Sequence, residues 1–158
     1  MAIEIEHKYL LINDEWRHLV THSMRYRQGY LTSNSNCSVR VRTGNDKAWL
    51  NIKSATIGSS RDEYEYEIPY QDADEMMQRL CKRPLIEKTR HFVPVGKHIW
   101  EVDEFEGENE GLIVAEIELS SHEETFVKPS WIGQEVTSDL RYYNNNLAAN
   151  PYRQWRYK

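Results

Sequence analysis

Residues 3–11 read IEIEHKYLL, and this stretch decides the fold. Its isoleucines alternate with two glutamates and a lysine, which are Glu4, Glu6 and Lys8. Successive side chains of a β-strand point to opposite faces, so the isoleucines share one face and the three charged residues share the other. The stretch therefore predicts a strand with one apolar face and one fully charged face.

Seven further segments show a strand pattern, most of them by clear alternation. They are residues 24–31, 37–44, 47–55, 61–68, 86–95, 98–105 and 112–119. Between the second and third of them, Gly44-Asn45-Asp46 is a short turn signal that predicts a hairpin. Eight short strands separated by turns are typical of an antiparallel sheet or barrel.

Helical patterns are fewer, and we expect them at residues 14–20, 72–80 and 138–148. The middle segment is predicted to begin with Asp72 as its N-cap, and the last with Ser138. No internal repeat and no Gly- or Pro-rich linker divides the chain. We therefore expect a single domain over residues 1–150, followed by a basic and aromatic tail at residues 151–158.

The polar faces of the predicted strands are segregated by charge. Ordinary solvated faces are one interpretation, because antiparallel sheets often have one side in water. Such faces usually mix serine, threonine, glutamine and lysine, whereas here two strands offer paired bases and three offer paired acids. These pairs are Arg40 with Arg42, Lys88 with Arg90, Glu63 with Glu65, Glu101 with Asp103, and Glu116 with Glu118. We therefore predict that the charged faces line a closed barrel and that the apolar faces point outward, beneath helices and loops.

Acids and bases gathered inside one barrel point to a particular ligand chemistry. Buried charges are costly unless they are paired or bind metals and charged ligands. Clustered carboxylates suit a hard divalent cation, which prefers oxygen ligands. Clustered arginines and lysines suit phosphate, which arginine binds with two parallel hydrogen bonds. Together the two groups predict a site for a metal-bound polyphosphate.

The order of these charged pairs also resembles a known family. Residues 4–8 read EIEHK and match the ExExK signature of the CYTH superfamily, the triphosphate tunnel metalloenzymes. The segments VRVR (39–42), NIKS (51–54), DEYEYEI (62–68), IEKTRH (86–91), EVDEF (101–105) and VAEIEL (114–119) follow in the family's order. The chain is most similar to short bacterial members that hydrolyse inorganic tripolyphosphate. The resemblance implies a mainly β, α+β fold: an eight-stranded antiparallel barrel with a charged interior and helices packed outside.

The resemblance further implies roles for individual residues. It implies that Mg²⁺ or Mn²⁺ is held by carboxylates among Glu4, Glu6, Glu63, Glu65, Asp103, Glu116 and Glu118. It implies that the triphosphate is held by Lys8, Arg40, Arg42, Lys53, Lys88, Arg90 and Arg141. In similar members a Lys–Tyr pair is associated with hydrolysis, and Lys8 and Tyr30 stand at those positions. One departure is visible, because relatives often read RYKN where this chain has RYYN, so a base is missing at Tyr143.

The predicted function is divalent-metal-dependent hydrolysis of inorganic triphosphate. A second metal near Glu63 and Glu65 would activate the attacking water, or Lys8 would take its proton, which requires a lowered lysine pKa. One alternative is a family activity on an organic triphosphate, as in a thiamine triphosphatase, a nucleoside triphosphatase or a class IV adenylate cyclase. Loops 55–61 and 106–111 are the candidates to bind such an organic group. The alternative from another class is a non-catalytic polyphosphate-binding module.

Composition limits the classes of partner and the cellular location that we expect for the protein. The net charge of −5 argues against a nucleic-acid binder, and no apolar run has the length of a membrane span. The first residues lack the pattern of a signal peptide, so we expect a cytoplasmic protein whose Cys37 and Cys81 are reduced. For the tail we weigh three interpretations: a cover for the tunnel mouth, a contact in a homodimer, and a frayed terminus.

Overall fold

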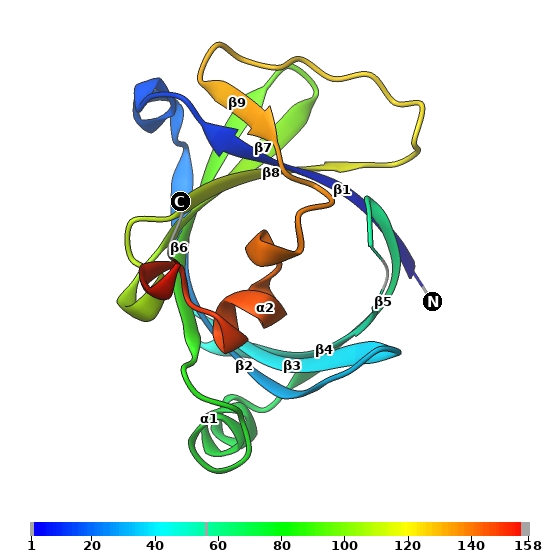
Figure 1. The fold of residues 1–158 in the computed structure, drawn as a ribbon, viewed down its shortest axis with the longest axis vertical. Helices are drawn as coiled ribbons and strands as arrows, with labels where there is room; N and C mark the ends of the chain where they lie inside the picture. The colour runs from blue at the N-terminus through cyan, green and yellow to red at the C-terminus, as the bar shows by residue number, and fades with distance from the viewer. Residues whose placement is uncertain (1, 56, 156–158) are drawn as a thin grey trace.

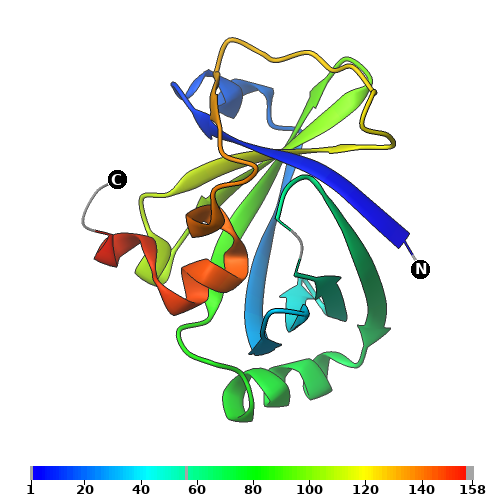
Figure 2. The same cartoon turned by 45° about the vertical axis from the view of Figure 1, so that its right-hand side comes forward.

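The computed structural model describes residues 2–55 and 57–155, in which eight antiparallel strands close into a barrel (Figures 1 and 2). The strands are β1 (Ala2–Leu11), β2 (His22–Ser33), β3 (Cys37–Gly44), β4 (Lys47–Ser54), β5 (Ser60–Ile68), β6 (Ile86–Val95), β7 (His98–Phe105) and β8 (Ile113–Leu119). Their order around the barrel is β5-β4-β3-β2-β6-β7-β8-β1, and the pairing of β1 with β5 closes the ring. The predicted eight-stranded antiparallel barrel is confirmed, as is the hairpin between β3 and β4, where Asn45 takes a left-handed conformation with φ 56°.

A ninth strand, β9 (Ile132–Glu135), was not predicted. It pairs with the end of β1, where Tyr9 lies opposite Glu135 and Leu11 opposite Ile132. This edge of β1 is free because β5 pairs only with residues 2–5 of that strand. The backbone groups of a free edge need partners, and β9 supplies them. A four-residue strand with a single large apolar side chain has too little pattern to be predicted from sequence.

The apolar faces of the strands point outward, as predicted. On one side, Ile5, Val102 and Ile117 pack beneath Trp16 of the 3-10 helix η1 (Glu15–Leu19) and beneath Trp131. On the other side, the outer faces of β3 and β4 pack against the helix α1 (Tyr70–Arg79), through the side chains Val41, Ala48, Ala73 and Met77. Some outward side chains are not covered, among them Ile3, which is 62% exposed, and Tyr66 of β5, which is 57% exposed. The sheet is therefore inverted relative to an ordinary solvated sheet.

Helix α1 begins earlier than predicted. Its N-cap is Pro69 and not Asp72, which lies in the first turn. Proline has its φ fixed near the helical value and has no N–H to lose, so the helix can begin directly after β5 ends at Ile68. The carboxylate of Asp72 then stabilises the positive end of the helix dipole.

The second helix, α2 (Asn144–Ala149), corrects the prediction that all helices pack outside. It lies across one end of the barrel, within the ring of strands in Figure 1. Its Leu147 and Ala148 pack in a buried cluster with inward-facing apolar side chains, among them Tyr30, Ile86, Phe105 and Val114. The interior is therefore charged over only part of its length. At one end it is apolar and covered by α2.

The segment before α2 also differs from the single helix predicted over 138–148. A 3-10 helix, η3 (Leu140–Tyr142), begins after Asp139, whose side chain accepts a hydrogen bond from the backbone N–H of Arg141. Tyr143 is extended, with φ −73° and ψ 135°, and separates η3 from α2. Asp139, and not Ser138, is therefore the N-cap. Two further 3-10 helices are η2 (Gly107–Asn109) and η4 (Tyr152–Gln154).

The described part of the tail packs against the barrel. Trp155 is buried edge-on against Tyr142, with 5.2 Å between ring centroids, so residues up to 155 are not frayed. Residues 156–158 lie outside the described part of the chain, and the homodimer through this tail stays a prediction. Cys37 and Cys81 are both free thiols. Within the described residues, no helix has both the length and the apolar character required to cross a bilayer.

Candidate active site

A cavity of about 420 Å³ occupies the charged part of the barrel. Its lining reaches from Phe92 near one end of the strands to the segment 140–146 at the other. It brings together most of the predicted site residues: Glu4, Glu6, Lys8, Tyr30, Arg40, Arg42, Lys53, Glu63, Glu65, Arg90, Glu116 and Glu118. Lys88, Asp103 and Arg141 do not line it. Of the two loops predicted to hold an organic group, the first contributes Ala55, Ile57 and Arg61, whereas 106–111 borders a separate groove.

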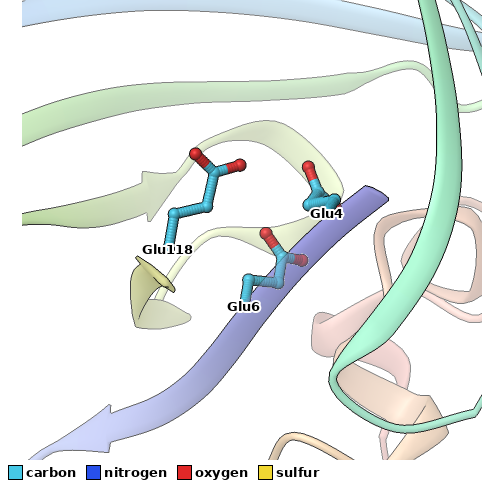
Figure 3. A group of neighbouring side chains, drawn as sticks. All are labelled: Glu4, Glu6 and Glu118. Atoms are coloured by element: carbon cyan, nitrogen blue, oxygen red, sulfur yellow. The ribbon is translucent and has the colours of Figure 1, made fainter. Parts of the chain in front are cut away.

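Three carboxylates form a cluster at one wall of the cavity. Glu4 and Glu6 come from β1, and Glu118 comes from β8, where it lies directly opposite Glu6. One oxygen of each lies within 4.8 Å of the others, and the three side chains project into the same space (Figure 3). Partial burial, and then the negative charges of Glu4, Glu101 and Glu6, raise the pKa of Glu118 to about 7. Oxygen ligands crowded in this way fit a hard divalent cation such as Mg²⁺ or Mn²⁺.

This raised pKa predicts that metal binding depends on pH. Below pH 7 a proton occupies Glu118, and a cation must displace it. From the titration of Glu118 alone, we expect Mn²⁺ to bind about tenfold more weakly at pH 6 than at pH 8. Burial also raises the pKa of Glu6, which acts in the same direction. Calorimetric titration of the metal-free protein at the two pH values measures this. Glu118→Gln should bind more weakly and lose most of the pH dependence, whereas equal affinities at both pH values would contradict the prediction.

The opposite part of the wall is rich in positive charge. Arg40 is buried, and its Nε donates to Asn51 Oδ1 at 3.4 Å; within the described residues no carboxylate lies at ion-pair distance from its guanidinium. Arg42 has one distant partner, Glu65 at 3.5 Å, and its buried Nε is unsatisfied. Burial, together with Arg40 and Arg90, lowers the pKa of Arg42 to about 10. Arg42 remains charged at neutral pH, and both guanidinium groups have donors to spare for an anion.

Glu63 and Glu65 of β5 have protein partners and are not part of the carboxylate cluster. Glu63 forms an ion pair with Lys53, whose Nζ lies 3.2 Å from the carboxylate. The same Nζ lies 3.1 Å from Glu4. Glu65 accepts a hydrogen bond from Asn51 at 2.6 Å. Lys53 therefore links β5 to the cluster through Glu4. A second metal at Glu63 and Glu65 stays a prediction.

Lys8 lies deeper than the cluster and is almost completely buried. Its Nζ contacts Glu116 at 2.8 Å and Glu6 at 3.7 Å. Burial alone would lower the pKa of Lys8, but the charges of Glu116 and Glu6 outweigh this and raise it above the usual value. Lys8 is therefore an ammonium ion, and the hypothesis that it acts as the general base lacks the lowered pKa that it requires. Glu116 lies between Lys8 and Arg90 and is not part of the carboxylate cluster.

Two predicted site residues lie in the barrel wall without lining the cavity. Lys88 and Asp103 are buried, and the Lys88 Nζ lies 2.7 Å from the Asp103 carboxylate. Arg90 contacts the same carboxylate through Nε at 2.8 Å and Nη2 at 2.9 Å. Burial lowers the pKa of Lys88 to about 8, while Arg90 and Lys88 outweigh burial and lower that of Asp103. Both residues are charged at pH 7. Asp103 orients Arg90, which does line the cavity.

The structure places Arg141 on the surface, where its guanidinium pairs with Asp139 at 2.9 Å. The turn of η3 buries Tyr142 instead.

Several cavity residues were absent from the predicted set, among them Arg61, Glu101 and Tyr143. The sequence contained a signal for Arg61, because it alternates in phase with Glu63 and Glu65 on the same strand. A signal for Glu101 was also present, because it lies two residues before Asp103 on the same strand face. Tyr143 reaches the cavity only through the turn between η3 and α2, which no periodicity indicates.

Comparison with known proteins gives concordant matches. The family model described as the CYTH domain matches residues 2–152. An inorganic triphosphatase of Acetivibrio thermocellus is 49% identical over 156 residues, which cover 99% of each chain. An inorganic triphosphatase of Nitrosomonas europaea is 35% identical and covers 93% of this chain and 97% of its own. A crystal structure of an inorganic triphosphatase superposes with a TM-score of 0.67 at 31% identity, and covers 94% of this chain and 95% of that one.

Proposed function

This chain belongs to the CYTH domain family, and on that premise we propose that it is an inorganic triphosphatase, a hydrolase of phosphoanhydride bonds. The observation that carries the proposal is the 49% identity to an inorganic triphosphatase over 99% of both chains. The cavity supports it independently, because it combines a cluster of three carboxylates with arginines that lack full ionic partners.

The basic side chains would hold the substrate. Triphosphate is an extended polyanion, and Arg40 and Arg42 of β3 and Arg90 of β6 present guanidinium groups to one cavity. Guanidinium groups bind phosphate oxygens with two charge-assisted hydrogen bonds, which fixes orientation as well as affinity. Arg90 is held in place by Asp103, and Arg40 by Asn51, so their donors are oriented before the substrate binds.

The carboxylate cluster would hold the metal. Glu4, Glu6 and Glu118 are the residues that fit Mg²⁺ or Mn²⁺. The cation, when bound, supplies positive charge to the phosphate oxygens and lowers the barrier to attack on phosphorus. Which of the two metals is used, and whether a second one binds, belongs to the proposal.

Lys8 would act as a fixed cation. Hydrolysis adds water across one P–O–P bond, and negative charge moves to the leaving phosphate oxygens as that bond breaks. The Lys8 ammonium lies beside Glu6 of the carboxylate cluster, inside a buried region where electrostatic interactions are weakly screened. It can donate hydrogen bonds to oxygens that gain charge. Tyr30 lines the same cavity, and its role in the predicted Lys–Tyr pair stays a prediction.

A substrate panel tests the function. We expect purified protein with Mg²⁺ or Mn²⁺ to release orthophosphate from tripolyphosphate faster than from ATP, thiamine triphosphate or pyrophosphate, and to stop when a chelator removes the cation. Orthophosphate, pyrophosphate and cyclic AMP are measured separately. Faster turnover of an organic triphosphate would favour another activity of the family, and tight binding of tripolyphosphate without turnover would favour a binding module.

A further inference from the structure

Arg61 is a charged cavity residue whose binding capacity is unused. It lies on β5 directly opposite Glu4 of β1, so its backbone neighbours the carboxylate cluster. Its buried Nε has no hydrogen-bond partner, and within the described residues no carboxylate lies at ion-pair distance from its guanidinium. A buried donor without a partner is costly, and native structures rarely keep one without a function. Arg61 also lines the cavity, where its guanidinium can donate to a bound anion.

Tyr143 holds this arginine in place. The Arg61 guanidinium carbon lies 5.0 Å from the centroid of the Tyr143 ring, and the Lys8 Nζ lies 5.8 Å from the same centroid. An aromatic face attracts cations at these distances. The ring itself is fixed, because its hydroxyl donates to the carbonyl of Thr137 at 2.9 Å and accepts from the N–H of Gly58 at 3.1 Å. The tyrosine side chain is also buried, so packing restricts its ring further.

We propose that Arg61 binds a phosphate group of the substrate beside the carboxylate cluster. We also propose that Tyr143 is a positioning residue that orients the Arg61 guanidinium. The inference rests on the proposed function for the identity of the anion. Tyr143 carries no charge of its own to a phosphate. Its contribution is indirect: its aromatic ring faces two cations that line the cavity, Arg61 and Lys8.

The first test removes or alters Arg61. We expect Arg61→Ala to raise the KM for tripolyphosphate, and the Kd measured by calorimetry without divalent metal, by about tenfold or more, with a smaller change in kcat. Arg61→Lys keeps the charge but loses the planar pair of donors, so it should recover only part of the affinity. Arg79→Ala is the matched control, because Arg79 is exposed at the end of α1 outside the barrel, and its KM and Kd should equal those of the wild type.

The second test addresses positioning. Tyr143→Leu removes the aromatic face and should raise KM and Kd, whereas Tyr143→Phe keeps the face and should rescue most of the loss. If Tyr143 acts through Arg61, Tyr143→Leu should weaken binding less in an Arg61→Ala background than in the wild type. Circular dichroism and thermal melting check that each variant is folded.

The outcomes separate this inference from the proposed function. A folded Arg61→Ala protein whose Kd lies within twofold of the wild type overturns the role of Arg61. Effects of the two substitutions that multiply independently overturn the positioning role of Tyr143. A wild type that hydrolyses no tripolyphosphate with either metal overturns the proposed function instead, and the metal-free Kd still decides whether Arg61 binds the polyanion.

Discussion

Replacing Lys8 by methionine is expected to lower kcat/KM for tripolyphosphate by about 10²–10³-fold. The substitution keeps most of the side-chain volume but removes an ammonium that lies 2.8 Å from Glu116 and faces the cavity. The phosphate oxygens lose a fixed cation, and two buried carboxylates are left facing the polyanion. Because a positive charge beside Glu6 opposes cation binding, the affinity for Mn²⁺ should not fall.

Measuring both kcat/KM and Mn²⁺ affinity distinguishes a role of Lys8 in binding phosphate from a role in the metal site. Lys97→Met is the matched control, since Lys97 is exposed in the turn between β6 and β7, and its kinetics should equal those of the wild type. A Lys8→Met enzyme that keeps kcat/KM within threefold of the wild type would show that this cation is dispensable. Loss of Mn²⁺ binding in a folded variant would instead place Lys8 in support of the cluster.

Replacing Asp103 by asparagine should cause the largest loss of stability. The carboxylate is the partner of Lys88, which is 0% exposed, and of Arg90, which contacts it through two nitrogens. Removing one partner of a buried ion pair leaves an uncompensated charge, which typically costs about 3–5 kcal/mol of unfolding free energy. Urea denaturation of the metal-free protein measures this cost.

Two further variants show whether the unpaired charge is the cause. Lys88→Met combined with Asp103→Asn removes the stranded ammonium and should restore part of the stability. Glu106→Gln breaks the exposed ion pair with Arg25, and should cost at most about 1 kcal/mol. A cost of that small size for Asp103→Asn would contradict the structural role assigned to this pair.

Lys8→Met is expected to lower activity and Asp103→Asn to lower stability, because the charged interior has two parts. Lys8 lines the cavity and can be satisfied by a ligand, whereas the Lys88–Asp103 pair is sealed within the wall and satisfied only by protein. Alternation along a strand places both lysines on the inner face but does not say which one reaches the cavity. Packing depth therefore separates substrate contacts from structural ones.

The sequence by itself determined the eight strands of the barrel, the inward direction of their charges and most of the charged residues that line the cavity. Side-chain direction alternates strictly along a strand, so the paired charges of β1, β3 and β8 could be assigned to one face without knowledge of their neighbours. Arg61 was within reach of the same rule. The hairpin at Asn45 was also local, because a tight turn has its own residue preferences.

Only the tertiary structure decided how these faces meet. The register of β1 against β8 placed Glu118 opposite Glu6 and left Glu63 with Lys53, a choice that depends on pairing between distant segments. The end of the barrel covered by α2, the position of Tyr143 and the surface position of Arg141 all follow from how the chain after β9 turns back onto the barrel. Local patterns encode which side of a strand is charged, whereas long-range packing determines which charges become partners, because partners are set by distance in space and not along the chain.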